Sequence, residues 1–103
     1  MALMFERENT SCVFTKPDAL ERNMGPKENP RDCISECTNM NLKSDREMDC
    51  MSVLFKKDGY CYLRGFRKTA DGDEKRGMPE CWRAQGDRSY VPLDYLSVPV
   101  TES

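Results

Sequence analysis

The fold of this chain is decided by the run Cys33-Ile-Ser-Glu-Cys37 and by the segment behind it, Cys50-Met-Ser-Val-Leu-Phe55 and Tyr60-Cys-Tyr-Leu63. Two cysteines four positions apart in a helix place both sulfur atoms on one helical face. The later segment is typical of two antiparallel strands joined by the turn Lys57-Asp-Gly59. The pattern therefore predicts a helix bonded twice to one hairpin. Such a unit is a small extracellular scaffold, and it favours binding over catalysis.

Length and composition predict one small domain held together by disulfides. The chain has 103 residues, of which 38% are hydrophobic and 33% are charged, so its core is thin. Small domains of this kind are usually crosslinked by disulfides in oxidising compartments. The six cysteines come without any histidine or Cys-x2-Cys pair, which excludes the common structural zinc layouts. We therefore expect three disulfides, no metal and no cofactor, in a secreted or cell-surface protein.

The charge balance and the first residues bear on partner and location. Sixteen basic against eighteen acidic residues give a net charge of -2, which argues against nucleic-acid binding. No apolar run reaches the roughly 18 to 20 residues that cross a bilayer, so membrane insertion is not expected. The segment Met1-Ala-Leu-Met-Phe5 is too short for a signal peptide, and we expect a secretory leader on the natural precursor. Asn9 begins a glycosylation sequon, Asn9-Thr10-Ser11.

The N-terminal third predicts little regular structure. Residues 1–10 are expected to form a polar lead-in, and residues 11–15 a short strand. Residues 18–30 contain Gly25-Pro26 and Asn29-Pro30, so this segment is expected to be a loop with one helical turn over residues 18–22. The domain itself is therefore expected to span residues 11–84.

A helix is expected from Pro30 to about Met40 or Leu42. Asn29 is a suitable N-cap, Pro30 fits the first helical position, and Asp32 places a negative charge in the first turn. The inward stripe repeats close to every 3.6 residues and consists of Cys33, Ile34, Cys37 and Met40 or Asn41.

A hairpin is expected after the helix. Residues 49–55 give the clearest strand pattern, the turn lies at residues 57–59, and the return strand covers residues 60–65. Alternation gives two faces, one with Cys50, Ser52 and Leu54 and the other with Met51, Val53 and Phe55. Both faces are partly apolar, which favours a central place in the sheet.

The C-terminal third is expected to be irregular. Residues 66–79 are charged and indicate an exposed loop or a second, irregular hairpin, and Cys81-Trp-Arg83 predicts a short closing strand. Residues 90–100 are rich in apolar side chains but contain Pro92 and Pro99, which confine them to a sheet edge or an extended tail. We expect residues 85–103 to form an extension that pairs within the domain, with residues 3–5 as one partner. Strand addition to another protein is the alternative.

Six cysteines allow fifteen pairings, and the predicted elements favour one of them. Cys33 and Cys37 lie one turn apart, so each is expected to reach a different strand. This suggests two nested bonds and a third that joins the first strand to the last: Cys33–Cys61, Cys37–Cys50 and Cys12–Cys81. In the chain-entropy model each bond stabilises the fold by about 3 to 4 kcal/mol. Together the three are comparable to the whole stability of a small domain.

At these residues the chain resembles the PAN/apple module family. The resemblance lies in the Cys-x3-Cys helix and the hairpin after it, and it covers about two thirds of the chain, from Cys12 to Cys81. It implies a curled antiparallel sheet that cradles one helix, with the same nested bonds and often a third that joins the ends. It also implies recognition of a protein or a glycan. Another disulfide-rich domain with a Cys-x3-Cys helix is the alternative, and the residues after Cys81 depart from the family's compact ending.

Catalytic and metal chemistry find little support in the sequence. Without histidine, Ser-His and Cys-His nucleophiles are excluded. Carboxylate pairs such as Asp71 and Asp73 are typical of solvated loops, and Asp71-Gly-Asp-Glu74 lacks the full calcium-loop pattern. We therefore expect a non-enzymatic protein without catalytic residues or metal ligands.

Two groups of side chains are candidates for ligand binding. Basic residues in and beside the hairpin could meet sulfates or an acidic partner: Lys56, Lys57, Arg64, Arg67, Lys68, Lys75 and Arg76. A basic patch of this kind binds heparin-like glycans in a member of the PAN/apple family. Aromatic side chains could stack on a neutral sugar: Tyr60, Tyr62, Phe66 and Trp82. A mixed-charge solvated surface is the plainer interpretation of the first group, and a thin core that of the second.

The sequence thus predicts an α+β PAN/apple-like module with three disulfides. The leading functional hypothesis is protein–protein recognition, in adhesion or receptor binding, through the exposed sheet face and the loop over residues 64–77. The partner would be a protein or glycan on a cell surface or in the extracellular matrix. Glycan binding is the alternative hypothesis, and a venom or saliva factor that inhibits a host receptor or protease is the third.

Overall fold

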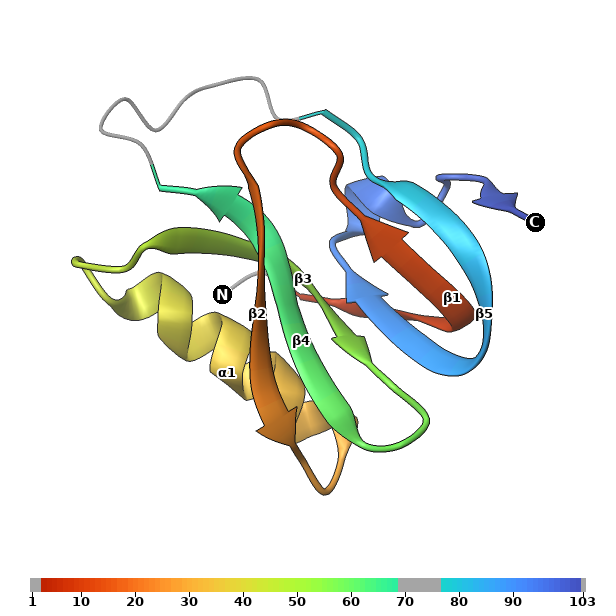
Figure 1. The fold of residues 1–103 in the computed structure, drawn as a ribbon, viewed down its shortest axis with the longest axis horizontal. Coiled ribbons are helices and arrows are strands. Elements are labelled where there is room, and N and C mark those ends of the chain that lie inside the picture. Colours follow the sequence, from red (N-terminus) through yellow and green to blue (C-terminus); the bar gives the residue numbers. More distant parts are fainter. Residues whose placement is uncertain (1–2, 69–76, 103) are drawn as a thin grey trace.

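One helix packs on an antiparallel sheet in the computed structural model, which describes residues 3–68 and 77–102 (Figure 1). The elements, in chain order, are β1 (Phe5–Val13), β2 (Ala19–Pro26), α1 (Pro30–Leu42), β3 (Met48–Phe55), β4 (Tyr60–Arg67), β5 (Glu80–Val91), the 3-10 helix η1 (Leu93–Tyr95) and β6 (Val100–Thr101). The sheet order is β1-β5-β3-β4-β2, with β6 parallel to β5. The predicted α+β class is confirmed, as are the disulfides Cys12–Cys81, Cys33–Cys61 and Cys37–Cys50.

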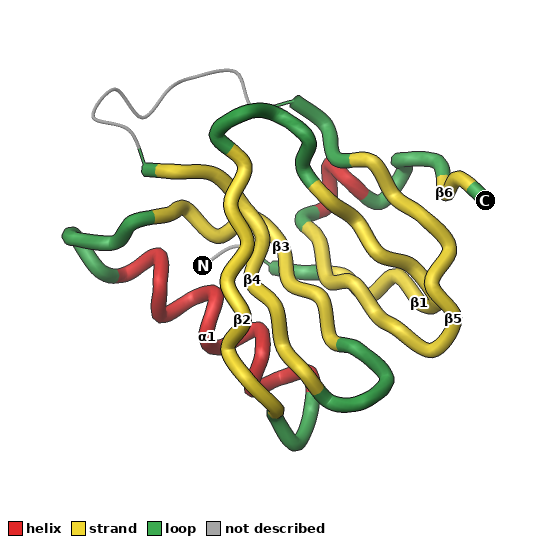
Figure 2. The backbone as a smooth tube through the Cα atoms, viewed as in Figure 1, coloured by secondary structure: helices red, strands yellow, loops and turns green. Residues whose placement is uncertain are grey.

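The helix begins and ends where the sequence predicts. The Asn29 side chain accepts a hydrogen bond of 3.0 Å from the Asp32 N–H, and Pro30 occupies the first turn. The buried side of α1 carries Cys33, Cys37 and Met40. Through this side the helix lies along one face of β3 and β4 (Figure 2). No helix among the described residues has the length and apolar character needed to cross a membrane.

The predicted β3–β4 hairpin is confirmed, but the predicted faces of β3 are wrong. A β-bulge shifts the register between Cys50 and Ser52. The extra residue reverses the alternation, because side chains on a strand change face at every step. Cys50 therefore shares the helix-facing core with Val53 and Phe55, whereas Met51 packs against the core on the other side.

The longest departure from prediction is the ribbon formed by β1 and β5. The polar lead-in expected over residues 1–10 is wrong, because β1 begins at Phe5. The closing strand expected over three residues is longer than predicted, because β5 has 12 residues. The ribbon bends at Asn9, which has a left-handed φ of 54°. Glu8 pairs with Arg88 and Thr10 pairs with Arg83, so Asn9 alone lies opposite residues 84–87. The Asn9 side-chain oxygen accepts a hydrogen bond of 2.9 Å from the N–H of Gly86, whose φ is 86°.

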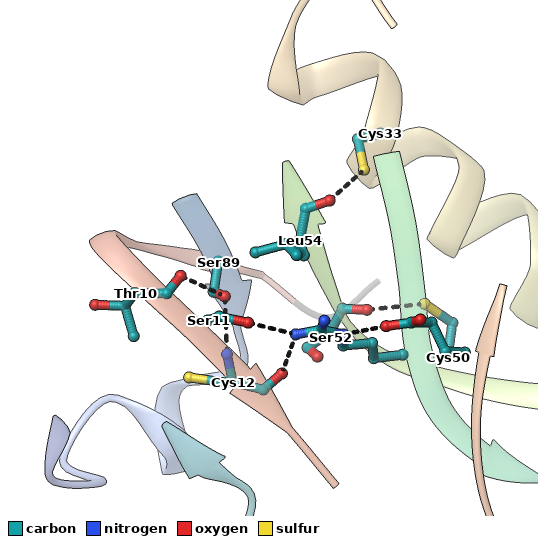
Figure 3. A network of polar contacts seen from close by, with 10 residues as sticks. Thr10, Ser11, Cys12, Cys33, Cys50, Ser52, Leu54 and Ser89 are labelled. Atoms are coloured by element: carbon teal, nitrogen blue, oxygen red, sulfur yellow. Dashed lines mark hydrogen bonds and ion pairs between the residues drawn. The ribbon is translucent and has the colours of Figure 1, made fainter. Parts of the chain in front are cut away.

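A buried hydroxyl holds the inner side of this bend. Ser89 donates to the Thr10 carbonyl at 2.9 Å and accepts from the Cys12 N–H at 3.2 Å (Figure 3). The bend folds the second half of the ribbon back, so that Cys12 and Cys81 lie directly opposite one another in neighbouring strands. A second small core forms around this disulfide, with Val91, Tyr95 and Val98.

The segment predicted as a loop before the helix is mostly strand β2. It pairs with β4 at the edge of the sheet, and no helical turn forms over residues 18–22. Gly25 has a φ of 81° at a bulge, and Pro26 ends the strand, which an edge position allows because one side of the backbone is unpaired.

The expected C-terminal extension over residues 85–103 is not separate from the domain, because residues 85–91 belong to β5, which lies between β1 and β3 rather than at an edge. The predicted pairing with residues 3–5 is confirmed where Phe5 lies opposite Val91. Pro92 follows the last residue of β5, and Pro99 directly precedes β6. The two prolines therefore interrupt the segment where its strands end and begin.

Candidate ligand-binding groove

The predicted basic residues do not form one patch. Lys56 and Lys57 lie at the β3–β4 turn, whereas Arg67 and Lys68 lie at the other end of β4. Strand β4 has 8 residues, and its length separates these ends by about 23 Å, at roughly 3.3 Å for each step from one residue to the next. Lys75 and Arg76 lie outside the described residues. The structure therefore divides the expected cationic surface into at least two separate parts.

Arg64 is part of the interior rather than of a binding surface. Its side chain is 12% exposed and forms an ion pair of 2.8 Å with Glu21 on β2. Its guanidinium also donates to the Ser11 hydroxyl at 2.8 Å and to the Cys12 carbonyl at 2.9 Å. Arg64 thus ties β4 to β1 across the curled sheet, and little of its charge faces solvent.

The aromatic candidates are also dispersed. Phe66 is fully buried and packs against Phe14 in a tilted arrangement with ring centroids 4.7 Å apart, so its ring is not accessible to a sugar. Trp82 is 39% exposed but lies on β5 between β1 and β6. Tyr60 is equally exposed near the hairpin turn, and Tyr62 lies 6.0 Å from the Lys56 ammonium.

The sequon residue Asn9 lies in the bend of β1. Its side-chain oxygen accepts from the Gly86 N–H, and the Ser11 hydroxyl of the sequon accepts from Arg64. Thr10 between them is buried. In the folded state both sequon side chains therefore already take part in hydrogen bonds that shape the ribbon.

A hollow that the sequence does not predict lies beside the C-terminal half of α1. Its volume is about 510 Å³, and the lining comes from the helix, the start of β3 and the residues that flank β1 and β5: Met4, Cys37, Thr38, Asn41, Leu42, Cys50, Met51 and Pro92. None of these residues is charged, in a chain in which 33% of residues are. A lining of this kind suits apolar groups of a ligand.

A second hollow, of about 430 Å³, extends along the helix toward its N-terminus. It is lined by Pro30, Arg31, Ile34, Ser35, Thr38, Asn39 and Tyr90. Thr38 lines both hollows, and we call the two together the α1 groove. Between Arg31 and Leu42 it follows the helix for about 16 Å, at roughly 1.5 Å per residue.

One exposed leucine lines the uncharged half of the groove, and two more adjoin lining residues in the chain. Leu42, a lining residue, is 78% exposed. Leu3 and Leu93 are 76% and 66% exposed and directly adjoin the lining residues Met4 and Pro92 in the chain. Exposed leucines scattered singly are ordinary, but an exposed apolar residue in the lining of a hollow is typical of an interaction site.

Asn41 satisfies the free backbone hydrogen-bonding groups at the floor of the groove. Its amide donates to the Cys50 carbonyl and accepts from the Cys50 N–H, both at 2.8 Å. These backbone groups lie on the side of β3 away from β4, where β5 pairs only from Val53 onward. The side chain therefore occupies the place of a neighbouring strand.

Known proteins do not add to this geometry. No protein-family model and no curated protein matches the chain. All six cysteines are disulfide-bonded and the chain has no histidine, so neither residue type supplies a nucleophile or a metal ligand. The groove and the charged ends of β4 are thus the features on which a function can be based.

Proposed function

We propose that this protein is a secreted, non-enzymatic recognition module of the PAN/apple type, which binds a protein partner in the α1 groove. Three disulfides support an oxidising, extracellular compartment. The helix bonded through Cys33 and Cys37 to two adjacent strands supports the fold type. The observation that carries the function is the uncharged hollow of about 510 Å³, whose lining includes the highly exposed Leu42.

Selection from a random peptide library tests this proposal. The disulfide-intact protein is immobilised, bound peptides are recovered, and each is tested again on a variant with Thr38→Trp, which fills the junction of the two hollows. Gln85→Trp, at an exposed position outside the groove, is the matched control. Near-ultraviolet circular dichroism verifies that both variants fold. Peptides that bind the native protein and Gln85→Trp but not Thr38→Trp support the proposal, and a selection without such peptides contradicts it.

Sulfated-glycan binding is a second candidate, favoured by one feature of the charged surface. A hollow of about 410 Å³ at the end of β4 is lined by Leu20, Arg46, Glu47, Arg67 and Lys68. Three cations and one carboxylate meet there, and that carboxylate already pairs with Arg22 at 2.7 Å. Cations gathered in this way can contact sulfate groups.

A heparin column with a salt gradient tests this candidate. The double variant Arg67→Gln/Lys68→Gln is expected to elute at clearly lower salt than the native protein, because each lost contact to the polyanion reduces the salt dependence. Lys56→Gln/Lys57→Gln, at the other end of the sheet, removes the same net charge and serves as the control. Equal elution of the two double variants would attribute retention to net charge and exclude a site at Arg67.

A further inference from the structure

We infer that the α1 groove takes a short segment of the partner protein in which apolar side chains lie three to five residues from a carboxylate, with the carboxylate at Arg31. This inference rests on the proposed function and specifies the chemistry of the partner. It follows from three properties of the groove. The groove has an uncharged half and a half with one cation, the backbone groups of Cys50 at its floor already have hydrogen-bond partners, and its length is limited.

The charge of the groove is concentrated at one end. Arg31 is exposed and is the one charged residue among those that line the two hollows. Within residues 3–68 and 77–102 it forms no ion pair. The nearby Glu6 carboxylate is already engaged, because it accepts from the Tyr90 hydroxyl at 2.7 Å and pairs with Arg88 at 3.5 Å. A cation with open donors in a groove favours a carboxylate ligand.

The other end selects apolar side chains rather than a strand. An added strand would need the outward N–H and carbonyl of Cys50, and Asn41 already satisfies both. A segment in the groove therefore gains free energy by placing side chains among Met4, Leu42 and Met51. Such binding is of the side-chain-in-groove kind, as opposed to strand addition.

The length of the groove limits the segment. About 16 Å of helix corresponds to roughly five residues of extended chain, at about 3.3 Å per residue. A carboxylate three to five residues from the first apolar side chain therefore reaches Arg31 while that side chain lies beside Leu42.

Three synthetic peptide pools test the inference. Each peptide carries two neighbouring positions filled at random with Leu, Ile, Phe or Met and, three residues away, Asp in the first pool, Asn in the second and Lys in the third. Every pool contains both orders of the apolar pair and the third residue. Retention on the immobilised native protein is measured by mass spectrometry. We expect the Asp pool to be retained about two- to fivefold more than the Asn pool, and the Lys pool least, as for an exposed ion pair. The variant Arg31→Glu is expected to reverse the order of the Asp and Lys pools, and Thr38→Trp to lose all three.

The outcomes separate the inference from the proposed function. Equal retention of the three pools, lost on Thr38→Trp, would overturn the inference and leave protein recognition in the groove intact. No retention of any pool, together with a failed library selection, would overturn both. A native protein that sediments as a dimer and becomes a monomer on Thr38→Trp would assign the groove to a second copy of the chain, and would also overturn the inference.

Discussion

Asn41 on α1 and Cys50 on β3 exchange two hydrogen bonds of 2.8 Å, one in each direction. This is the pattern by which residues of neighbouring antiparallel strands pair. Cys50 is also disulfide-bonded to Cys37, one helical turn before Asn41. Helix and strand are thus joined twice within a single helical turn. The Asn41 amide also leaves no backbone group of Cys50 free at the floor of the α1 groove.

Removal of this amide should destabilise the domain. In Asn41→Ala, the N–H and carbonyl of the buried Cys50 lose their partners, which costs roughly 1 to 3 kcal/mol of the free energy of unfolding. Urea denaturation monitored by circular dichroism measures the change. Asn39→Ala, at an exposed position of the same helix, is the control and should change stability by less than about 0.5 kcal/mol. Equal effects of the two substitutions would contradict the pairing role.

Arg64 should act on stability, in contrast to the other cations of β4. Arg64→Met keeps the apolar stem but leaves the Cys12 carbonyl and the Glu21 carboxylate without their cationic partner, so we expect a loss of roughly 2 to 4 kcal/mol. Arg67→Met, three residues further along the strand and exposed, should be nearly neutral. Urea denaturation of both variants makes the comparison. If Arg64→Met left the free energy of unfolding unchanged, Arg64 would again be a candidate for ligand binding.

Gly65 should tolerate no side chain, because β4 passes close to β3 at the bulge. A Cβ atom there would overlap the backbone carbonyl of Asp49, so Gly65→Ala is expected to lose about 3 kcal/mol or more, or to fail to fold. Gly25→Ala is the comparison. Gly25 has a left-handed φ of 81° but open space around its Cβ position, so it should cost only about 1 to 2 kcal/mol. Similar thermal stability of the two variants would contradict the close approach at Gly65.

The elements that could be predicted carry their signals locally. Asn29-Pro30 marks the start of α1, and Lys57-Asp-Gly59 marks the turn of the hairpin. Strand β1 lacks such a signal, because Glu6-Arg7-Glu8 has the composition of a solvated segment and its partner residues lie about 80 positions later. Strand β2 is concealed by Gly25-Pro26, which usually indicates a loop but here ends an edge strand.

The candidate site could not be predicted for a different reason. Its walls combine Leu42 of α1 with Met4 and Pro92, which come from opposite ends of the chain and are brought together by the pairing of β1 with β5. The basic residues mislead in the opposite way. They are close in sequence, yet the length of β4 separates Lys57 from Arg67, and burial removes Arg64. Leu42, apolar at the exposed end of a helix, is the one signal that could have drawn attention to the groove.

The three disulfides should differ in their contribution to stability. The loops they close have sequence separations of 69, 28 and 13 residues. In the chain-entropy model, Cys12→Ala/Cys81→Ala should therefore lose about 4.4 kcal/mol, and Cys37→Ala/Cys50→Ala about 2.9 kcal/mol. Urea denaturation of the two double variants checks the order. Mass spectrometry of unreduced peptides provides the control, since it must find the two remaining bonds in each variant. The reverse order would indicate that packing around Cys50 outweighs loop length.

Tyr90 should make stability depend on pH in the alkaline range. Burial, together with its hydrogen bond to the Glu6 carboxylate and the charge of that group, raises the pKa of Tyr90 to about 12. An unfolded tyrosine ionises near pH 10. Because the pKa is higher in the folded state, the stabilising contribution is complete below about pH 10 and is lost as the pH rises to about 12. Two pKa units correspond to about 2 to 3 kcal/mol. Rapid urea unfolding at pH 9 and pH 12 should thus show a larger alkaline loss for the native protein than for Tyr90→Phe. Tyr60→Phe, at an exposed position, should behave as the native protein does, and an identical pH dependence of all three proteins would contradict the role of the Tyr90–Glu6 hydrogen bond.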